Sequence, residues 1–462
     1  MLDFSPPERP GSPSQARPTA IDLFAGAGGL SLGLEQSGFD VLASVEYDPV
    51  HATTHAFNFP MTEVLCDDMS TLQPETIVEA ARKGWAAHGG CENWDGDVDL
   101  IAGGPPCQGF SFIGKRDVSD PRNSLIVHFF RVIQAIRPKY FIMENVPGIA
   151  SGNHRSLLID LIRLFQENGY TITSPQILNA ADFGVPQDRR RFVLLGTRDG
   201  LPRLVYPNPK YKPVREVRSS LAFSGLPYGP TVWDAIGDIP NLDEFDELLE
   251  HDQVHLSRSQ LAISELARSE YGARLAGAND PADYSYSRVW CRELLTSSAR
   301  TVHTQKSIDR FNATPQGHVE PISRFLRLAE DGLCNTLRAG TGGDHGAFTS
   351  PRPIHPRLPR VISVREAARL HSFPDWFRLH ATKWNGFRQI GNSVPPLLGR
   401  ALGSSVVDAL GLTPVKPECD WELGDVSLLH LAMGEAASVA GATHTTMPLS
   451  RRISYQQRAG LG

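Results

Sequence analysis

"AIDLFAGAGGLSLGLEQS", residues 20–37, decides the fold class of this 462-residue chain. Ala20–Phe24 is apolar and predicts a buried strand, Gly26–Gly29 predicts a tight turn, and Leu30–Ser37 predicts a helix. A glycine turn between a strand and a helix lets a ligand approach the backbone at the helix N-terminus. The spacing fails the dinucleotide pattern G-x-G-x-x-G, because Ser31 stands where the last glycine would be.

The alternation of strand and helix continues through the first half of the chain. The strands that we expect next are 41–45, 98–102, 140–144 and 191–196, with helices at 124–136 and 154–168. This alternation predicts an α/β fold with a doubly wound, mainly parallel sheet that is covered by helices on both faces. Ligands bind such sheets beyond the carboxyl ends of the strands, so functional residues should follow the strands directly. Between 196 and 360 the alternation fades into an irregular region rich in Pro and Gly, which predicts a second, smaller domain.

The composition is that of an ordinary globular protein, with 41% hydrophobic and 21% charged residues. No apolar run approaches the roughly 20 residues that span a membrane, and the Pro-rich N-terminus lacks the apolar segment of a secretory signal. We therefore expect a disordered lead-in and a cytoplasmic protein. Six scattered cysteines form no C-x-x-C pair and no metal-ligand cluster with His, which argues against a zinc site and a disulfide framework.

Charge is unevenly distributed around a net value of −6, which argues against indiscriminate binding to nucleic acid. Residues 243–252 carry six acids and no Lys or Arg. Residues 351–400 carry two acids and nine bases, which are Arg352, Arg357, Arg360, Arg365, Arg369, Arg378, Lys383, Arg388 and Arg400. Composition supports two interpretations of this basic stretch equally: a surface that faces phosphates, or a solvated helix face with ordinary surface arginines.

Acidic residues follow the second expected strand and the segment TEVLC, residues 62–66. Glu46 could bind ribose hydroxyls, and Asp67 or Asp68 could accept a hydrogen bond from an adenine amino group. An adenosine-containing ligand without a pyrophosphate fits this arrangement, and S-adenosylmethionine is such a ligand. The alternative interpretation is a tight strand–helix connection that binds nothing.

Cys107 lies in GGPPCQGFS, residues 103–111, directly after an expected strand. Pro105 and Pro106 restrict the backbone before it, which gives the thiol a defined direction at the ligand-binding edge. Reactive cysteines lie at partly exposed positions where positive charge or a helix dipole stabilises the thiolate.

Two other groups should reach the same edge: Glu144, at the end of a strand, and the arginines of QDRRR, residues 187–191. A thiolate, an acid and arginines beside a methylsulfonium donor describe methylation of cytosine at C5. The thiolate adds to C6, the acid stabilises the charge that develops at N3, and the activated C5 attacks the methyl group.

The chain resembles the cytosine-C5 DNA methyltransferase family in six motifs that follow the family's order. The motifs, which span residues 21–402, are DLFAGAGGLSLGLEQSGF, GGPPCQGFS, MENVPG, QDRRRFVLLG, RVISVREAARLHSFPDWF and QIGNSVPPLLGRAL. Taken singly, Cys107 would more often be a buried structural thiol and the arginines a solvated surface. Their joint occurrence favours the enzyme.

The resemblance implies a Rossmann-like fold that binds S-adenosylmethionine, with an irregular target-recognition domain. The catalytic residues that it implies are Cys107 as the nucleophile, Glu144 on cytosine N3 and its amine, Asn145 in support of that strand end, Arg189 on cytosine O2, and Arg191 and Gln187 as residues that orient the loop. The cofactor contacts that it implies are Phe24, Gly26, Gly28, Gly29 and Leu30 around the ligand, Glu46 on the ribose, Tyr47 on the adenine, Asp67 and Asp68 on the amino group, and Pro105, Asn392 and Val394.

The DNA contacts implied by the resemblance come from two parts of the chain. A stretch that closes over DNA supplies Gln108, Ser111 and Lys115, and the residues near the flipped base are Gln187, Thr336, Leu337 and Arg338. We expect the residues that read base edges among Arg338, Arg324, Arg327, Lys306 and His318.

Five segments follow from these assignments. They are a lead-in, 1–17; a catalytic and cofactor-binding domain, 18–206; a target-recognition domain with a hinge, 207–384; a C-terminal return, 385–413; and a tail, 414–462, which reads as a frayed extension or as a partner-binding element. We expect a monomer that acts on double-stranded DNA, away from membranes, with a restriction or defence nuclease as a partner. The rival hypotheses are a tRNA cytosine-5 methyltransferase on the same scaffold and a catalytically silent DNA-binding protein.

Overall fold

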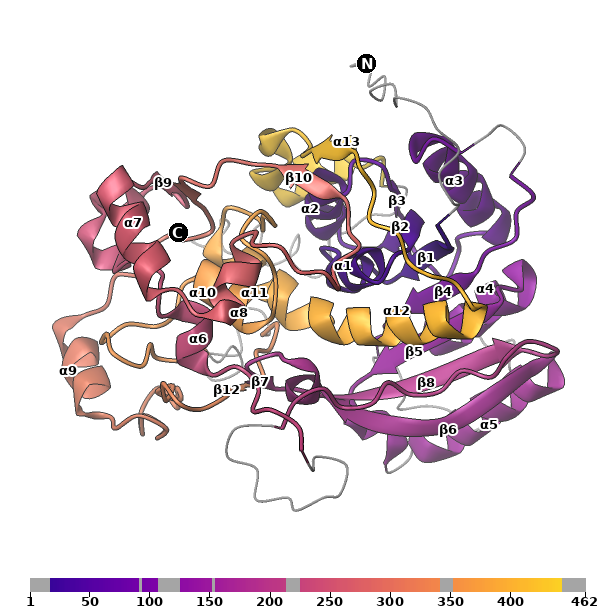
Figure 1. Cartoon of the computed structure of the whole chain (residues 1–462), viewed down its shortest axis with the longest axis horizontal. Helices are drawn as coiled ribbons and strands as arrows, with labels where there is room; N and C mark the ends of the chain where they lie inside the picture. Colours follow the sequence, from indigo (N-terminus) through magenta and orange to yellow (C-terminus); the bar gives the residue numbers. More distant parts are fainter. Residues whose placement is uncertain are drawn as a thin grey trace, which may run out of the picture.

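A seven-stranded sheet with helices on both faces forms one half of the molecule, and a more irregular region forms the other (Figure 1). The computed structural model describes residues 17–90, 94–106, 125–151, 154–212, 225–340 and 352–442.

The sheet has the strand order β3-β2-β1-β4-β5-β8-β6. Its strands are β1 (Thr19–Leu23), β2 (Asp40–Glu46), β3 (Glu63–Cys66), β4 (Leu100–Gly103), β5 (Tyr140–Asn145), β6 (Tyr170–Asn179) and β8 (Arg190–Arg198). Neighbouring strands from β3 to β5 are parallel, and β8 lies antiparallel between β5 and β6. The order reverses between β1 and β4, which is where a doubly wound sheet binds its ligand. The expected fold class is confirmed.

Helices from both ends of the chain cover the two faces of the sheet. On one face, α3 (Pro74–Ala87), α4 (Leu125–Ile136) and α5 (His154–Glu167) share an apolar core with the strands. On the other face, α1 (Gly29–Gln36) packs beside α12 (Pro396–Leu410) over a second core. The two helices approach closely at Gly33, where an added Cβ would lie 2.5 Å from the carbonyl oxygen of Pro396.

The second half of the molecule is built from short elements. Its helices are α6 (Val232–Ile236), α7 (Arg258–Ala267), α8 (Glu270–Leu275), α9 (Gln305–Ala313), α10 (Val364–Leu370) and α11 (Lys383–Asn392). Its strands are β9 (Val254–His255), β10 (Ser287–Val289), β11 (Leu294–Leu295) and β12 (Cys334–Asn335). β12 pairs in parallel with β7 (Gln187–Asp188), which joins this half to the half that contains the seven-stranded sheet. The remaining elements, apart from those of the C-terminal segment, are α2 (Pro49–Asn58), η2 (Pro147–Ala150), η3 (Ala180–Phe183), η5 (Leu242–Glu244) and η6 (Asp246–Leu249).

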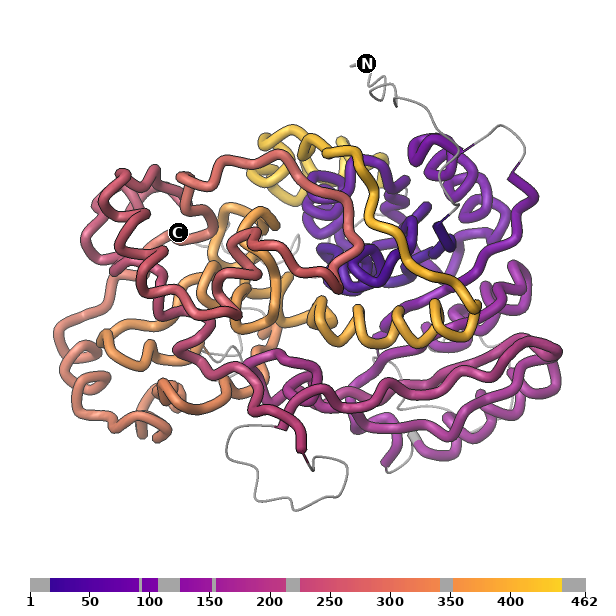
Figure 2. Tube along the Cα trace, in the orientation of Figure 1, coloured from indigo at the N-terminus to yellow at the C-terminus, as the bar shows by residue number. Residues whose placement is uncertain are grey.

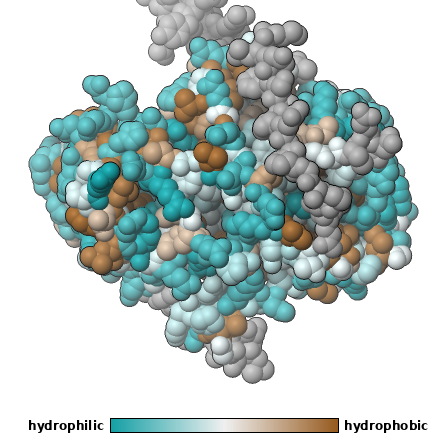
Figure 3. All heavy atoms as spheres, turned by 45° about the horizontal axis from the view of Figure 1, so that its top comes forward, coloured by the Kyte–Doolittle hydropathy of each residue, from teal (hydrophilic) through white to brown (hydrophobic). Residues whose placement is uncertain are grey.

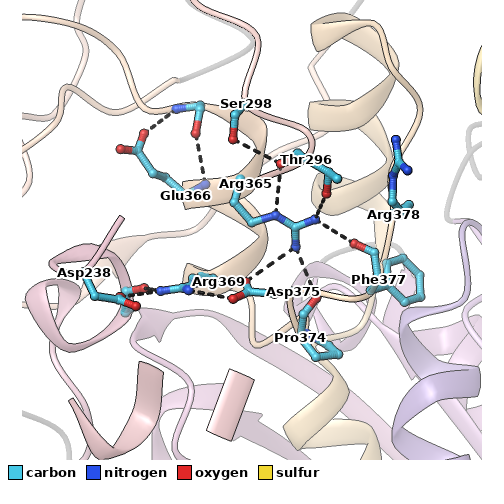
Figure 4. A network of polar contacts seen from close by, with 12 residues as sticks. Asp238, Thr296, Ser298, Arg365, Glu366, Arg369, Pro374, Asp375, Phe377 and Arg378 are labelled. Atoms are coloured by element: carbon cyan, nitrogen blue, oxygen red, sulfur yellow. Dashed lines mark hydrogen bonds and ion pairs between the residues drawn. The ribbon is translucent and has the colours of Figure 1, made fainter. Parts of the chain in front are cut away.

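Buried arginines hold this irregular half together, as Figure 4 shows. Arg369 bridges Asp238 and Asp375, and Arg365 donates to Thr296 Oγ1 at 2.7 Å and to the carbonyl of Phe377 at 2.9 Å. These pairs add directional contacts to the apolar core that the elements of this half share, and the desolvated charges are matched by carboxylates and carbonyls.

Both interpretations of the basic stretch 351–400 are therefore wrong for more than half of its bases. The buried ones are Arg360, Arg365, Arg369, Arg378 and Arg400. Arg360 pairs with Glu366, and Arg400 pairs with Asp280 at 2.8 Å. Burial alone would raise the pKa of Glu366, but the Arg360 guanidinium lowers it to about 2. The amino-acid composition gives the number of charges and does not identify their partners, whether six residues away, as for Arg360, or 120 residues away, as for Arg400.

The C-terminal segment up to Ala442 packs against the rest of the molecule. β13 (Asp420–Glu422) pairs with β10, and Trp421 is buried beside Met61 and Tyr286. η9 (Val426–Leu429) and α13 (Met433–Val439) lie against α2, where the yellow tube of Figure 2 crosses the indigo part of the chain. The interpretation of the tail as a frayed extension is wrong for residues 414–442, and residues 443–462 lie outside the described residues.

The surface mixes polar and apolar side chains, and hydrophilic residues dominate the face in Figure 3. Among the described residues, no helix is long and apolar enough to cross a membrane.

We predict that Arg369→Ala lowers the free energy of unfolding by about 3–5 kcal/mol, because it removes the buried guanidinium that bridges Asp238 and Asp375 and leaves Asp238 with Arg268 alone. The check is the urea midpoint of the purified protein. Arg163→Ala, which removes an exposed partner of Asp160 on α5, should change stability by less than about 1 kcal/mol. Equal effects of the two substitutions would contradict the structural role of Arg369.

Candidate active site

Several of the predicted site residues lie at the edge of the sheet where the parallel strands end. Glu46 ends β2, Glu144 and Asn145 end β5, and the chain that leaves β4 passes through Pro105. Cys107, Gln108, Ser111 and Lys115 lie outside the described residues, so their roles stay predictions. No group of three or more His, Cys, Asp or Glu that could hold a metal ion occurs within the described ranges.

The end of β5 carries a buried ion pair. Arg191 Nε lies 2.6 Å from Glu144 Oε1, and both side chains are almost entirely buried. A Cβ added at Gly104 would lie 3.0 Å from Glu144 Oε2, so the backbone after β4 runs directly beside this carboxylate. The sequence predicted Glu144 at this edge, and the structure adds that Arg191 contacts it.

Asn145 fixes the chain that leads to residue 107. Its Nδ2 donates to the carbonyl of Pro105 at 2.8 Å, and its Oδ1 accepts from the amide of Val146 at 2.8 Å. A side chain at the end of one strand therefore positions the turn after the neighbouring strand. The resemblance implied a supporting role for Asn145, and this bond gives that support a specific form.

The structure does not support the expected contact of Arg189 with cytosine O2, because the guanidinium of Arg189 is bonded to the backbone of the protein. Its buried guanidinium donates to the carbonyls of Leu337, Gly391 and Ser393, each at 2.8 Å. Burial, and then the nearby Arg191, lower the pKa of Arg189. The expectation treated 187–191 as one extended run, but the structure breaks that run between β7 and β8, so the two arginines face different partners.

Gln187 and Leu337 were also expected to contact DNA, but the side chains of both residues are buried in the protein. Gln187 Oε1 accepts from the amide of Leu337 at 3.2 Å, and its Nε2 donates to the carbonyl of Leu370 at 3.2 Å. Gln187 therefore supports this segment from inside the protein. Thr336 Oγ1 donates to the carbonyl of Asp188 at 2.6 Å, and Arg338 is exposed.

The glycine turn forms a cradle against Glu46. The amide of Gly26 donates to Glu46 Oε2 and that of Asp48 to Oε1, each at 2.8 Å. Phe24 and Gly26 have positive φ values of 62° and 58°, and a Cβ at Gly26 would meet no atom within 4 Å. A non-glycine residue in this region is strained, and such strain is common at ligand sites. The glycine turn therefore has open space beside Gly26, and two backbone amides hold the Glu46 carboxylate next to it.

Four other expected cofactor contacts are packing residues in this structure. A Cβ at Gly28 would lie 2.4 Å from the Phe59 ring, and one at Gly29 would lie 2.5 Å from the carbonyl oxygen of Val394. Leu30 and Val394 belong to the core beneath α1 and α12. A backbone contact of these residues with a ligand stays a prediction, as does that of the exposed Asn392.

The adenine side of the expected pocket follows β2 and β3. Tyr47 is half-exposed, and the carboxylates of Asp67 and Asp68 accept from the amides of Asp68 and Ser70, at 2.7 and 2.8 Å. The neighbouring Cys66 is buried, and burial, followed by the negative charge of Glu46, raises the pKa of its thiol to about 12.

The sequence reasoning missed a buried polar group beneath the cradle. Ser31 Oγ donates to Asp22 Oδ2 at 2.6 Å and lies 3.0 Å from His55 Nε2. Asp22 is an acid within the apolar strand AIDLF, and this pattern was the signal that could have revealed it.

Comparison with known proteins supplies the family context of this geometry. A family model described as C-5 cytosine-specific DNA methylase matches residues 19–408. The chain is 49% identical over 433 residues to the type II methyltransferase M.XorII of Xanthomonas oryzae pv. oryzae, a match that covers 93% of this chain and 94% of that protein. It is 32% identical over 441 residues to the type II methyltransferase M.AgeI of Thalassovita gelatinovora, across 84% and 99% of the two chains.

A solved structure gives a similar result. The crystal structure of a protein assigned as a DNA modification methyltransferase encoded within a prophage of E. coli superposes with a TM-score of 0.64 at 31% identity. The match covers 85% of this chain and 99% of that chain.

We predict that Gly29→Ala destabilises the protein by about 1–3 kcal/mol, because the new methyl group would overlap the carbonyl of Val394 and force the C-terminal return away from α1. The measurement is thermal and urea unfolding. Gly148→Ala is the matched control, since a Cβ there meets no atom within 4 Å. If Gly29→Ala has the stability of the wild type, the backbone at Val394 can move away from the added methyl group without a loss of stability, which would contradict the prediction.

Proposed function

The chain belongs to the C-5 cytosine-specific DNA methylase family and is a DNA cytosine-5 methyltransferase, and from this premise we propose how its own residues perform the reaction. Cys107 is the nucleophile, Glu144 and Arg191 hold the cytosine, and the cradle of Phe24, Gly26 and Glu46 binds S-adenosylmethionine. The observation that carries the proposal is the hydrogen bond from Asn145 to the carbonyl of Pro105, because it holds the chain that leaves β4 beside the strand end that carries Glu144.

The reaction begins with the cytosine outside the DNA duplex, because its C6 atom is inaccessible within the base stack. The Cys107 thiolate bonds to C6, and the Glu144 carboxyl in its protonated form donates to N3, so that the charge displaced onto the ring is stabilised. When bound, S-adenosylmethionine supplies an electrophilic methyl group for C5. Loss of the C5 proton and departure of the Cys107 sulfur then restore the aromatic ring.

The assignment of Cys107 as the nucleophile is supported by the protonation state of two other thiols. Cys66 lies at the same edge of the sheet, but burial raises its pKa to about 12, so it is protonated at neutral pH. Burial also raises the pKa of Cys334 well above its ordinary value. Neither thiol has the thiolate character that addition to a ring carbon requires.

We assign the contact with cytosine O2 to Arg191 in place of Arg189. Arg191 contacts the Glu144 side chain that we assign to N3, and O2 is the neighbouring polar atom of the ring. The guanidinium of Arg189 donates hydrogen bonds to three backbone carbonyls, so we assign Arg189 a positioning role. A cation beside O2 and an acid beside N3 together stabilise the negative charge that builds up when the thiolate adds.

The cradle fits an adenosine-containing methyl donor. Glu46 presents a carboxylate fixed by the amides of Gly26 and Asp48, and carboxylates accept hydrogen bonds from ribose hydroxyls. Tyr47 offers a half-exposed ring next to it for the adenine, and Asp67 supplies the acceptor for the amino group. The residues present therefore match the chemistry of S-adenosylmethionine.

Double-stranded DNA is the proposed substrate, and a restriction–modification system with a cognate nuclease is the proposed setting. The type II methyltransferases among the relatives support both, since one of them aligns with nearly the whole chain. They favour DNA over the rival tRNA substrate. Arg338 and Arg324 are exposed candidates for contact with DNA, whereas Arg327 is committed to the carbonyls of Phe311 and Thr314. We propose that a monomer performs the reaction.

We predict that Cys107→Ala abolishes transfer of labelled methyl groups to duplex DNA and changes the affinity for S-adenosylmethionine by less than about threefold, because the thiol acts on the base alone. Cys291→Ala, which alters an exposed thiol, should keep wild-type activity. A covalent complex with DNA that contains 5-fluorocytosine should form with the wild type and not with Cys107→Ala. Full activity of Cys107→Ala would refute the mechanism.

We predict opposite phenotypes for two arginines that lie two residues apart. Arg191→Lys should lower kcat by about 10-fold or more, because the planar donor to developing negative charge is lost, and should change stability little, because a cation stays beside Glu144. Arg189→Ala should instead lower the unfolding temperature, because three carbonyls lose their donor. The exposed Arg190→Ala is the control. A stable Arg189→Ala with the larger loss of kcat would reverse the assignment.

A further inference from the structure

A buried polar network lies directly beneath the cradle. It consists of Asp22 on β1, Ser31 on α1 and His55 on α2, and none of the three is more than 1% exposed. Ser31 Oγ donates to Asp22 Oδ2 at 2.6 Å and lies 3.0 Å from His55 Nε2. A Cβ at Gly28 would lie 3.1 Å from His55 Cδ2, so the ring supports the glycine turn from below. The network therefore touches the loop that receives the methyl donor.

The charge of Asp22 is poorly compensated in the protein itself. Within the described part of the chain, its Oδ1 atom has no hydrogen-bond partner, and the same holds for His55 Nδ1. Burial raises the pKa of Asp22 to about 7; the hydrogen bond from Ser31 lowers it and the charge of Glu46 raises it. Burial lowers the pKa of His55 to about 3, so its ring is neutral at pH 7 and offers no positive charge.

The strand neighbours of Asp22 supply no positive charge. Its register partners on β2 and β4 are Ser44 and Ala102, which carry no charge. The charged group that acts on it is Glu46, whose Oε2 binds the amide of Gly26 in the cradle and whose Oε1 lies 3.8 Å from Nδ1 of His51 on α2. Asp22 is thus coupled electrostatically to the residue that we assign to the ribose.

We propose that Asp22 discriminates between the methyl donor and the demethylated product by their difference in charge. The sulfonium of S-adenosylmethionine is positive, whereas the thioether of S-adenosylhomocysteine is neutral and the other groups of the two molecules are the same. A cation in the cradle favours the ionised form of Asp22, and its loss after methyl transfer lets Asp22 regain a proton. The inference rests on the proposed function, because it requires the donor to occupy the cradle.

Linkage fixes the sign of the effect. A ligand that favours ionised Asp22 expels a proton when it binds, and its affinity therefore increases as the pH rises through the pKa of the free protein, about 7. The neutral product has a weaker preference for the ionised form. The ratio of donor affinity to product affinity should accordingly increase between acid and alkaline conditions. Asp22 acts here as a positioning residue, through charge and without contact with the base.

The test is isothermal titration calorimetry of the full chain with S-adenosylmethionine and with S-adenosylhomocysteine, each at about pH 6 and about pH 8, on either side of the Asp22 pKa. Two buffers of different ionisation enthalpy report the protons released. For the wild type we expect the affinity ratio to rise by about fivefold and the donor to release more protons than the product. For Asp22→Asn we expect a constant ratio and no difference in proton release.

Two further variants keep the test decisive. Ser31→Ala retains the Asp22 carboxyl and removes a hydrogen bond that lowers its pKa, so the change in affinity ratio should move to higher pH even if Asp22→Asn does not fold. Asp160→Asn, which removes an exposed carboxylate on α5, should behave as the wild type.

A constant ratio in the wild type, or an unchanged pH dependence in a folded Asp22→Asn or Ser31→Ala, would overturn the inference. Failure of both compounds to bind at either pH would instead refute the proposed cofactor, so the two failures are distinguishable.

Discussion

One buried guanidinium, that of Arg189, joins the three parts of the chain from which the site is assembled. It extends from the catalytic sheet and bonds to carbonyls at Leu337, in the irregular half, and at Gly391 and Ser393, in the C-terminal return. A guanidinium offers five N–H donors in a rigid plane, so it can hold several carbonyls at fixed mutual positions. The pairing of β7 with β12 runs beside it and adds backbone hydrogen bonds to the same junction. The site depends on this junction because the segments that border it are far apart in sequence.

Much of the fold and part of the site could be predicted from local sequence. The apolar strands and the glycine turn after Leu23 have a periodicity that neighbouring residues determine, and strand ends in a parallel sheet meet at one edge. This argument was enough to place Glu46, Glu144 and Asn145 at the same edge of the sheet. The family itself was recognisable because six motifs occur in a fixed order, and the family model confirms it.

What could not be predicted depended on partners distant in the chain. Arg189 and Arg191 look equivalent in QDRRR, and only the break between two strands separates their roles. Arg369 and Arg400 looked like surface charges until Asp238 and Asp280 were placed beside them. The Ser31 hydroxyl, which excluded a dinucleotide pattern in the sequence, proves to be the centre of a buried network. In each case the sequence supplied the group, and tertiary packing supplied its partner.

The pairing of α1 with α12 bears on how the polypeptide folds as it is made. The apolar face of the sheet beside α1 is covered by side chains such as Leu398, Leu402 and Val406, which are synthesised about 370 residues after α1 itself. Until the ribosome has released that region, the nascent N-terminal half carries an uncovered hydrophobic surface. Chaperone capture during translation would shield this surface, and premature termination before residue 396 would leave a product prone to aggregation.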